Sequence, residues 1–161
     1  MNAPTKPRRI LGCDPGVSGA LALIDFDANS IEIHDMPITK IDGKSRINHH
    51  TLANLIFLLD ADLAVVEHVS ASPQMGVVSA FNFGQSFASI VQALASSQTP
   101  YELVAPNVWT RVMGVKAKEN DSSRQRASML MPQFSQHWPN KGHHGRSDAA
   151  LLSLYGKKHL T

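Results

Sequence analysis

The segment from Arg8 to Asp25 constrains the fold most, because two apolar runs flank a Pro15-Gly16 pair. Proline fixes one φ angle and glycine tolerates unusual ones, so the pattern predicts two strands joined by a tight turn. Asp14 stands at the end of the first apolar run. A carboxylate there is costly to desolvate unless a cation or hydrogen-bond donors compensate it. Asp14 is therefore a candidate metal or phosphate site, although an Asp before Pro-Gly can also simply start a turn.

A second carboxylate occupies a comparable position. The apolar run from Leu63 to Val69 follows a predicted helix from about His50 to Asp60, which is typical of a buried parallel strand, and Glu67 lies near its C-terminal end. Packing does not explain an acid at that place. Ligands gather at the carboxyl ends of strands in open α/β sheets, so Asp14 and Glu67 can meet if their strands are neighbours.

A third carboxylate lies near the C-terminus. The segment from His143 to Tyr155 places polar residues ahead of an amphipathic helix, with Asp148 in the expected first turn. A carboxylate in a first turn favours the helix dipole, so capping is the alternative interpretation. The small residues Ala149 and Ala150 would let this helix pack closely on the sheet. Such packing would point Asp148 toward the same edge as the other two acids.

The remaining chain reads as further strands, helices and loops. Ile31–His34 alternates like a third strand, and the polar stretch Lys40–Asn48 predicts a loop. The other expected elements are a helix with Ser79 as N-cap that ends near Ala95, a strand at 101–104 closed by Pro106, a short helical turn at 108–113, a polar loop at 114–123 and a basic helix from Ser123 to Met131. Phe83 and Phe87 are expected in the core, whereas Phe81 lies nearer the site loop.

Length and composition favour one intracellular domain. With 161 residues, the chain can bury a core of its own, and we expect a mobile tail over 1–8 and a single domain over 9–161. One cysteine, Cys13, excludes an internal disulfide framework and is expected to fill the core. No apolar run approaches the roughly 18 residues of a membrane span, and the N-terminus lacks a signal-peptide core. We therefore expect a soluble protein with no membrane partner.

Charge is unevenly distributed around a net value of +2. Acids outnumber bases from 14 to 103, whereas bases outnumber acids from 104 to 146. This arrangement suits a polyanion bound next to a metal-binding carboxylate cluster, and a merely mixed, solvated surface would explain it equally well. Four bases of the second region are candidate phosphate contacts, namely Lys116, Lys118, Arg124 and Arg126.

Three features now coincide in order along the chain. They are a strand ending Gly-x-Asp-Pro-Gly-x-x-Gly-Ala, a strand ending in Glu67 followed by Pro-x-x-Gly-x-x-Ser-x-Phe-x-Phe-Gly, and a late Asp-Ala helix. This set resembles the RuvC-type Holliday junction resolvases of the RNase H-like superfamily, particularly the shorter phage-type members. The match runs from Arg9 to Tyr155. It implies an α/β fold with a mixed five-stranded sheet in the order 3-2-1-4-5, antiparallel for strands one to three and parallel for one, four and five, with helices on both faces.

The resemblance also assigns roles. Asp14 looks like the first-strand carboxylate that bridges two metal ions, Glu67 like the fourth-strand ligand, and Asp148 like the carboxylate that opens the last helix. The family usually has one more acid just upstream, where this chain offers His144, with His143 beside it. The resemblance implies that His144 is a metal ligand or general base, and that the cofactor is Mg²⁺ or Mn²⁺, two ions per site.

The implied function is metal-dependent cleavage of four-way DNA junctions by paired nicks that leave 5′-phosphate and 3′-hydroxyl ends. The partners would be branched DNA, contacted by Phe81 and the four bases named above, and a second copy of the chain in a homodimer. The setting would be the cytoplasm of a bacterial or phage-infected cell, or an organelle matrix. Two alternatives stay open: a nuclease of broader range that also cuts flaps and forks, and a catalytically weak junction-binding protein.

Overall fold

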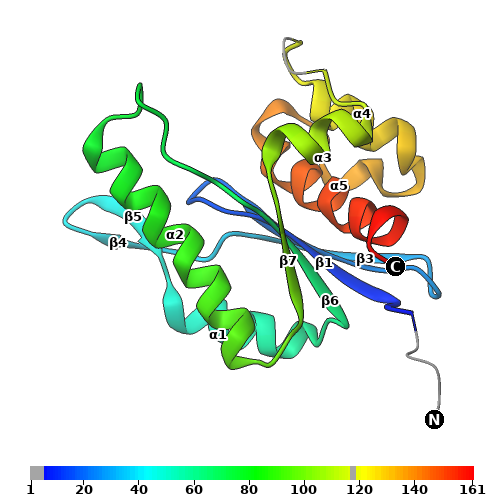
Figure 1. The fold of residues 1–161 in the computed structure, drawn as a ribbon, viewed down its shortest axis with the longest axis horizontal. Coiled ribbons are helices and arrows are strands. Elements are labelled where there is room, and N and C mark those ends of the chain that lie inside the picture. Colours follow the sequence, from blue (N-terminus) through cyan, green and yellow to red (C-terminus); the bar gives the residue numbers. More distant parts are fainter. Residues whose placement is uncertain (1–5, 117–118) are drawn as a thin grey trace.

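A mixed five-stranded sheet forms the centre of the molecule. The computed structural model describes residues 6–116 and 119–161, so Lys118 and part of the expected N-terminal tail lie outside the described residues. The five strands are β1 (Arg9–Asp14), β2 (Ala20–Asp25), β3 (Ser30–Asp35), β6 (Leu63–Glu67) and β7 (Tyr101–Val104). They lie in the order β3-β2-β1-β6-β7, antiparallel from β1 to β3 and parallel for β1, β6 and β7 (Figure 1). The predicted order and strand directions are confirmed.

A second, two-stranded sheet replaces the loop expected over Lys40–Asn48, so that prediction is wrong. Strands β4 (Ile38–Ile41) and β5 (Lys44–Ile47) pair antiparallel. Asp42 and Gly43 join them with φ angles of 50° and 73°. Positive φ at both turn residues is the geometry that twists two strands into a tight hairpin. Because β4 is exposed along its whole length, it lacks the buried apolar face that usually reveals a strand.

Five α-helices and two short 3₁₀ segments are the other regular elements of residues 6–116 and 119–161. They are α1 (His49–Leu59), α2 (Val77–Ser96), α3 (Pro106–Met113), α4 (Ser122–Leu130), α5 (His144–His159) and the 3₁₀ segments Pro132–His137 and Lys141–His143. The Asn48 side chain caps α1 by accepting from the Thr51 N–H at 3.1 Å. Ser79 is not the N-cap of α2, because Gly76 occupies that position and the helix begins earlier than expected. None of the described helices is both long and apolar enough to span a bilayer.

Two apolar cores lie on opposite faces of the sheet (Figure 1). Side chains alternate along β1, so Ile10 joins the core beneath α3, α4 and α5, while Leu11 and Cys13 join the core beneath α1 and α2. Cys13 is fully buried, which confirms its predicted place in the core. Phe83 and Phe87 are only partly buried, and Phe81 is 65% exposed.

Helix α5 lies directly on β1, as its small residues predicted. Ala149 and Ala150 are fully buried, and the Ser153 hydroxyl donates to the Ile10 carbonyl at 2.8 Å. A Cβ atom added at Gly12 would lie 1.8 Å from the Ala149 carbonyl oxygen. The strand therefore needs glycine at this position, because the helix backbone fills the space of any side chain. The contact brings the first turns of α5 to the C-terminal end of β1.

Candidate active site

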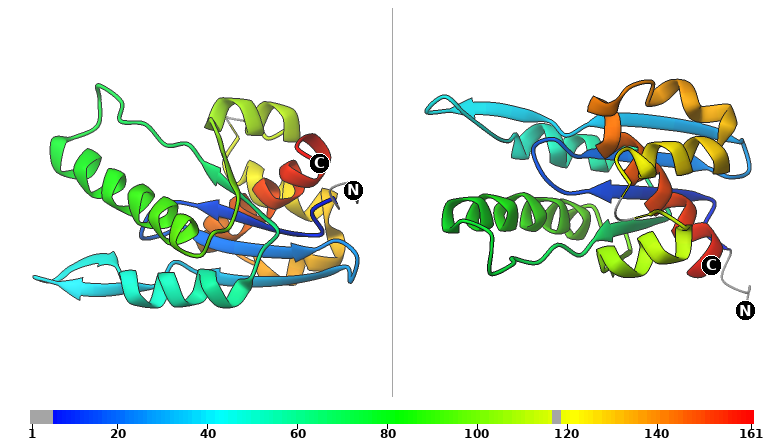
Figure 2. Two further views of the ribbon diagram at one scale, coloured as in Figure 1. Left: turned by 60° about the horizontal axis from the view of Figure 1, so that its bottom comes forward. Right: turned by 90° about the horizontal axis from the view of Figure 1, so that it is seen from above.

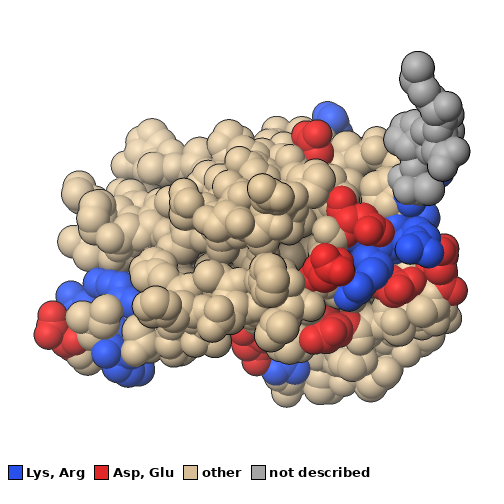
Figure 3. Space-filling model, turned by 90° about the horizontal axis from the view of Figure 1, so that it is seen from below, with Lys and Arg blue, Asp and Glu red and all other residues tan. Residues whose placement is uncertain are grey.

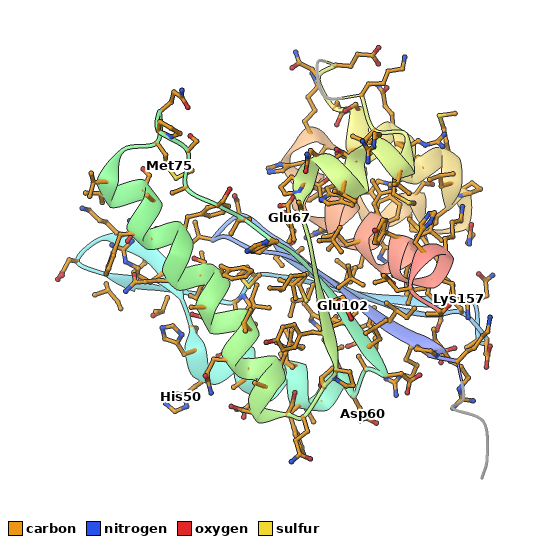
Figure 4. The ribbon with its side chains drawn as sticks, in the orientation of Figure 1. His50, Asp60, Glu67, Met75, Glu102 and Lys157 are labelled. Atoms are coloured by element: carbon orange, nitrogen blue, oxygen red, sulfur yellow. The ribbon has the colours of Figure 1, made fainter. Side chains whose placement is uncertain are left out.

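Asp14 and Glu67 end two neighbouring parallel strands. In the register of β1 and β6, Cys13 lies opposite Val66, so the next residue on each strand is one of the two acids. Both acids are partly buried. Figure 4 shows Glu67 at the end of β6, below α3. The expected meeting of the two carboxylates at the carboxyl edge of the sheet follows from this register.

Asp148 reaches the same edge from α5. The helix begins at His144, so Asp148 lies in its second turn and not in the first turn as predicted, which weakens the capping interpretation. Gly145 rests on the turn between β1 and β2: a Cβ there would lie 2.6 Å from the Ser18 carbonyl and 3.1 Å from Asp14 Oδ2. This close approach places the start of α5 against the first carboxylate.

Burial raises the pKa values of all three acids, and repulsion between carboxylates adds to the rise for Asp14 and Asp148. Burial, followed by the charges of Asp148 and Glu67, raises the pKa of Asp14 well above its usual value. Burial also raises the pKa of Glu67, against the opposing effect of a hydrogen bond from Trp109. Burial and the charge of Glu67 raise the pKa of Asp148 to about 6, although the nearby Ser123 hydroxyl and His144 lower it. The three carboxylates thus form one electrostatic unit, as acids that share a ligand site do.

Trp109 is a residue of this site that the sequence reasoning missed. Trp109 belongs to α3, and its ring is buried. Its indole N–H donates to Glu67 Oε1 at 2.9 Å. A buried indole N–H needs an acceptor, so a tryptophan soon after the β7 strand was the available signal. The bond fixes one oxygen of Glu67 and leaves the other free to bind.

His144 and His143 take different places. His144 is exposed and lies one helical turn before Asp148, close enough to lower the pKa of that acid. The charge of His143 instead acts on Asp35, at the end of β3. In the described part of the chain, His143 Nδ1 is buried without a hydrogen-bond partner. Of the two histidines, His144 is the one beside the carboxylates.

The donor atoms of this site suit a hard divalent cation. Asp148 Oδ1 is buried with no hydrogen-bond partner among the described residues, which leaves a charged oxygen uncompensated. Carboxylate oxygens are the ligands that Mg²⁺ and Mn²⁺ prefer. The donor types therefore fit such a cation. As the described side chains are arranged, however, no three Asp, Glu, His or Cys residues form a group that could hold a metal ion.

The predicted DNA contacts are in varied surroundings. Lys116 is exposed and bonds Glu119 at 2.9 Å, and Phe81 projects from α2. Arg124 forms an ion pair with Asp121 and also donates to backbone carbonyls, and Arg126 donates to the Met113 carbonyl at 2.6 Å. Arg126 therefore links α4 to the end of α3, and Arg124 links α4 to the backbone at Trp138 and Pro139. Among the predicted contacts that the structure describes, Lys116 and Phe81 have exposed side chains.

Solved structures resemble this chain over nearly its whole length. Thermus thermophilus RuvC in complex with a Holliday junction substrate matches with a TM-score of 0.63 and 12% identity, covering 94% of this chain and 96% of that one. The chain has the RuvC-type resolvase fold. The fowlpox virus Holliday junction resolvase matches this chain with a TM-score of 0.53 and 18% identity, covering 95% of this chain and 99% of that one. The yeast mitochondrial resolvase matches with a TM-score of 0.53 and 14% identity, covering 94% and 80%. No family model and no curated protein matches the sequence.

Proposed function

We propose that this protein is a metal-dependent endonuclease that resolves four-way DNA junctions by paired nicks. The observation that carries the proposal is the convergence of Asp14, Glu67 and Asp148 from β1, β6 and α5 into one coupled, partly buried site. The RuvC-type fold supports the choice of substrate, because the similar structures are Holliday junction resolvases.

The three carboxylates and His144 would hold one or two Mg²⁺ or Mn²⁺ ions. Such ions, when bound, neutralise phosphate charge and activate water for attack on a phosphodiester. Asp14 would take the central place, because both other acids act on it. Trp109 orients Glu67, and Asp148 offers its unpartnered oxygen. In their present arrangement the described side chains do not form a group of three such ligands, so holding an ion would require them to move closer together.

The products expected from this chemistry are 5′-phosphate and 3′-hydroxyl ends. Paired nicks need two sites that face opposite strands, so we propose that a two-fold homodimer is the active form.

Cleavage of end-labelled synthetic DNA tests the proposal. A four-way junction, a flap and a plain duplex are compared with Mg²⁺, Mn²⁺ or EDTA. We expect symmetric nicks in the junction alone, only with metal. Equal cutting of the flap would instead establish the broader debranching nuclease, and cutting of the duplex would contradict structure selectivity.

A junction-binding protein with weak or no nuclease activity is the second candidate. Two observations favour it: the described residues form no ready metal group, and a histidine stands where related chains were expected to carry an acid. Such a protein would hold junctions in EDTA as tightly as in Mg²⁺ and yield no product with any metal. That result would remove the nuclease proposal.

A further inference from the structure

A polar cleft separates the β4–β5 hairpin from the N-terminal half of α2. It has a volume of about 230 Å³, and its polar lining consists of Ser45, Arg46, Ser79, Asn82 and Ser86. A smaller hollow continues from it past His49 and Gln85. Figure 2 shows the hairpin and the start of α2 together at the end of the molecule opposite the C-terminus. Neither the predicted DNA contacts nor the carboxylate site includes these residues.

Arg46 supplies an uncommitted positive charge in this cleft. Its side chain is half-buried, and Nη1 donates to the Ser45 carbonyl at 3.1 Å. Within 6–116 and 119–161, no Asp or Glu forms an ion pair with Arg46, whereas Arg124 and Arg146 pair with Asp121 and Asp35. A guanidinium carries five N–H donors, so most of the donors of Arg46 are free to bind an anion.

The lining around Arg46 suits a phosphate. The Ser45 and Ser79 hydroxyls and the Asn82 amide are neutral donors, whereas the Ser86 hydroxyl already donates to the Asn82 carbonyl at 3.1 Å. No described acid lines either the cleft or its continuation. The hairpin itself carries Lys40, Lys44 and Arg46 against Asp42 alone. Figure 3 shows a small, mainly basic group of side chains at one end of a face whose middle is uncharged. A phosphate oxygen in the cleft would therefore meet donors and positive charge, without a repelling carboxylate.

The cleft adjoins the loop between β1 and β2. Gly16 and Val17 form part of its wall, and they belong to the turn that directly follows Asp14. A Cβ added at Gly16 would lie 3.5 Å from the Phe83 ring, so this turn lies against α2. A nucleic-acid strand leaving the carboxylates on this side would pass over the cleft.

We propose that this cleft binds a backbone phosphate of the DNA strand next to the cleaved bond, with Arg46 as its charged anchor. The inference rests on the proposed function, because it assigns a second contact to the same substrate. The contact reads no sequence; it positions the strand, as phosphate contacts in general do. Ser45, Ser79 and Asn82 complete the cradle as neutral donors.

Junction binding in EDTA tests the cleft separately from catalysis. Fluorescence anisotropy compares wild type, Arg46→Ala and Arg46→Lys with Lys158→Ala, which removes the same charge from an exposed position at the far end of α5. We expect Arg46→Ala to weaken binding about tenfold at moderate salt. A plot of log affinity against log salt concentration should also be less steep for Arg46→Ala than for Lys158→Ala. The expected difference in slope is about one, which corresponds to one phosphate contact. Arg46→Lys should keep the slope but lose part of the affinity, because a lysine cannot bind a phosphate bidentately.

Single methylphosphonate linkages then locate the contact. Each such linkage neutralises one phosphate of a junction arm. Among the linkages near the branch, we expect one to weaken junction binding by the wild type most. The same linkage should have little effect on junction binding by Arg46→Ala, which already lacks the contact. Unchanged thermal unfolding of the variants shows that they remain folded. If Arg46→Ala matches Lys158→Ala in affinity and slope while wild type binds and nicks junctions, the cleft proposal alone is overturned. If wild type shows no preference for junctions over duplex, the proposed function and the cleft fail together.

Discussion

At the scale of single residues, the site concentrates negative charge where the fold gains nothing from it. Asp14, Glu67 and Asp148 each have a raised pKa, and burial is the largest cause for all three. A group of partly buried carboxylates destabilises a metal-free protein, since each ionised acid loses hydration and repels the others. The arrangement is understandable if a cation compensates it during function.

Removing one carboxylate should abolish nicking without loss of junction binding. We expect Asp14→Asn and Glu67→Gln to reduce the nicking rate by about three orders of magnitude or more, because each deletes a proposed metal ligand. Junction affinity in EDTA should stay equal or rise, since a negative charge near the DNA is lost. Glu102→Gln, an exposed acid on β7, is the matched control and should nick normally. Loss of binding in Asp14→Asn would show instead that this acid supports the fold.

The stability of the metal-free protein should fall as pH rises from about 4 to about 6. Asp148 has a pKa of about 6 in the folded protein against an ordinary value of 3.8, so the folded state holds a proton that the unfolded state has released. The effect amounts to at most about 3 kcal/mol from this residue. Urea unfolding in EDTA at several pH values measures it. For Asp148→Asn, the free energy of unfolding should depend less on pH, and at pH 7 it should be higher than that of the wild type. Parallel pH curves for the two proteins would show that the raised pKa of Asp148 does not contribute to the pH dependence of stability.

Trp109 should act as a positioning residue for Glu67. We expect Trp109→Phe to keep the fold and to lower the nicking rate several-fold, because Glu67 loses the hydrogen bond that orients it. The loss also removes the interaction that opposes the rise of its pKa, so the pH profile of nicking should shift upward. A purely structural role would change the unfolding temperature and leave the pH profile in place.

Sequence patterns identified the acids but not this partner. Asp14 and Glu67 stand out because an acid at the end of an apolar run is costly. Trp109 does not stand out, since a tryptophan on a short helix is consistent with simple packing. Its acceptor lies forty-two positions away in sequence, and only the pairing of β6 with β7 brings the two together.

At the scale of elements, the contact between α5 and β1 sets the geometry of the site. The helix backbone lies against the strand backbone at Gly12 and against the β1–β2 turn at Gly145. Both contacts rely on the absence of a side chain. The position of Asp148 relative to Asp14 therefore follows from the backbones themselves.

Gly12→Ala should destabilise the protein by at least about 3 kcal/mol, because the new methyl group would meet the backbone of α5. The urea midpoint measures the loss. Gly84→Ala is the matched control: no described atom lies within 4 Å of a Cβ at that helical position, so the change should be neutral or stabilise α2 by about 0.5–1 kcal/mol. Equal midpoints for Gly12→Ala and wild type would contradict the close packing.

Elements with a buried apolar face were predictable, and exposed or irregular ones were not. Strands β1, β2 and β6 are largely buried, β3 packs the partly buried Ile31 and Ile33 against the core, and β7 buries Val104. The family resemblance supplied the order of these strands. The β4–β5 hairpin was missed because its exposed strands alternate weakly, although Asp42-Gly43 is a strong hairpin turn. The start of α5 was placed too late because a 3₁₀ segment leads into it without a capping side chain.

At the scale of the whole molecule, charge is absent from one entire helical layer. Helices α1 and α2 contain no Lys, Arg, Asp or Glu, and Figure 3 shows much of the resulting uncharged surface. Phe57 and Leu58 of α1 are 70% and 75% exposed on it. A hollow between α1 and α2 lies beside Phe57. An apolar side chain next to a hollow is the kind of surface that can pair with its own copy about a two-fold axis.

We expect the protein to be a dimer through this α1–α2 face. Light scattering after gel filtration should give twice the chain mass of 17.5 kDa. Phe57→Glu should give the mass of a single chain. Both copies contribute the same patch to an isologous interface, so the dimer would have to bury two new charges in apolar surroundings. Met129→Glu, at a similarly exposed residue of α4 on the opposite layer, should remain dimeric. On a junction with both strands labelled, the Phe57→Glu monomer should accumulate singly nicked molecules, since nothing holds a second site on the opposite strand. A monomeric wild type that still makes paired nicks would contradict both the interface and the need for a dimer.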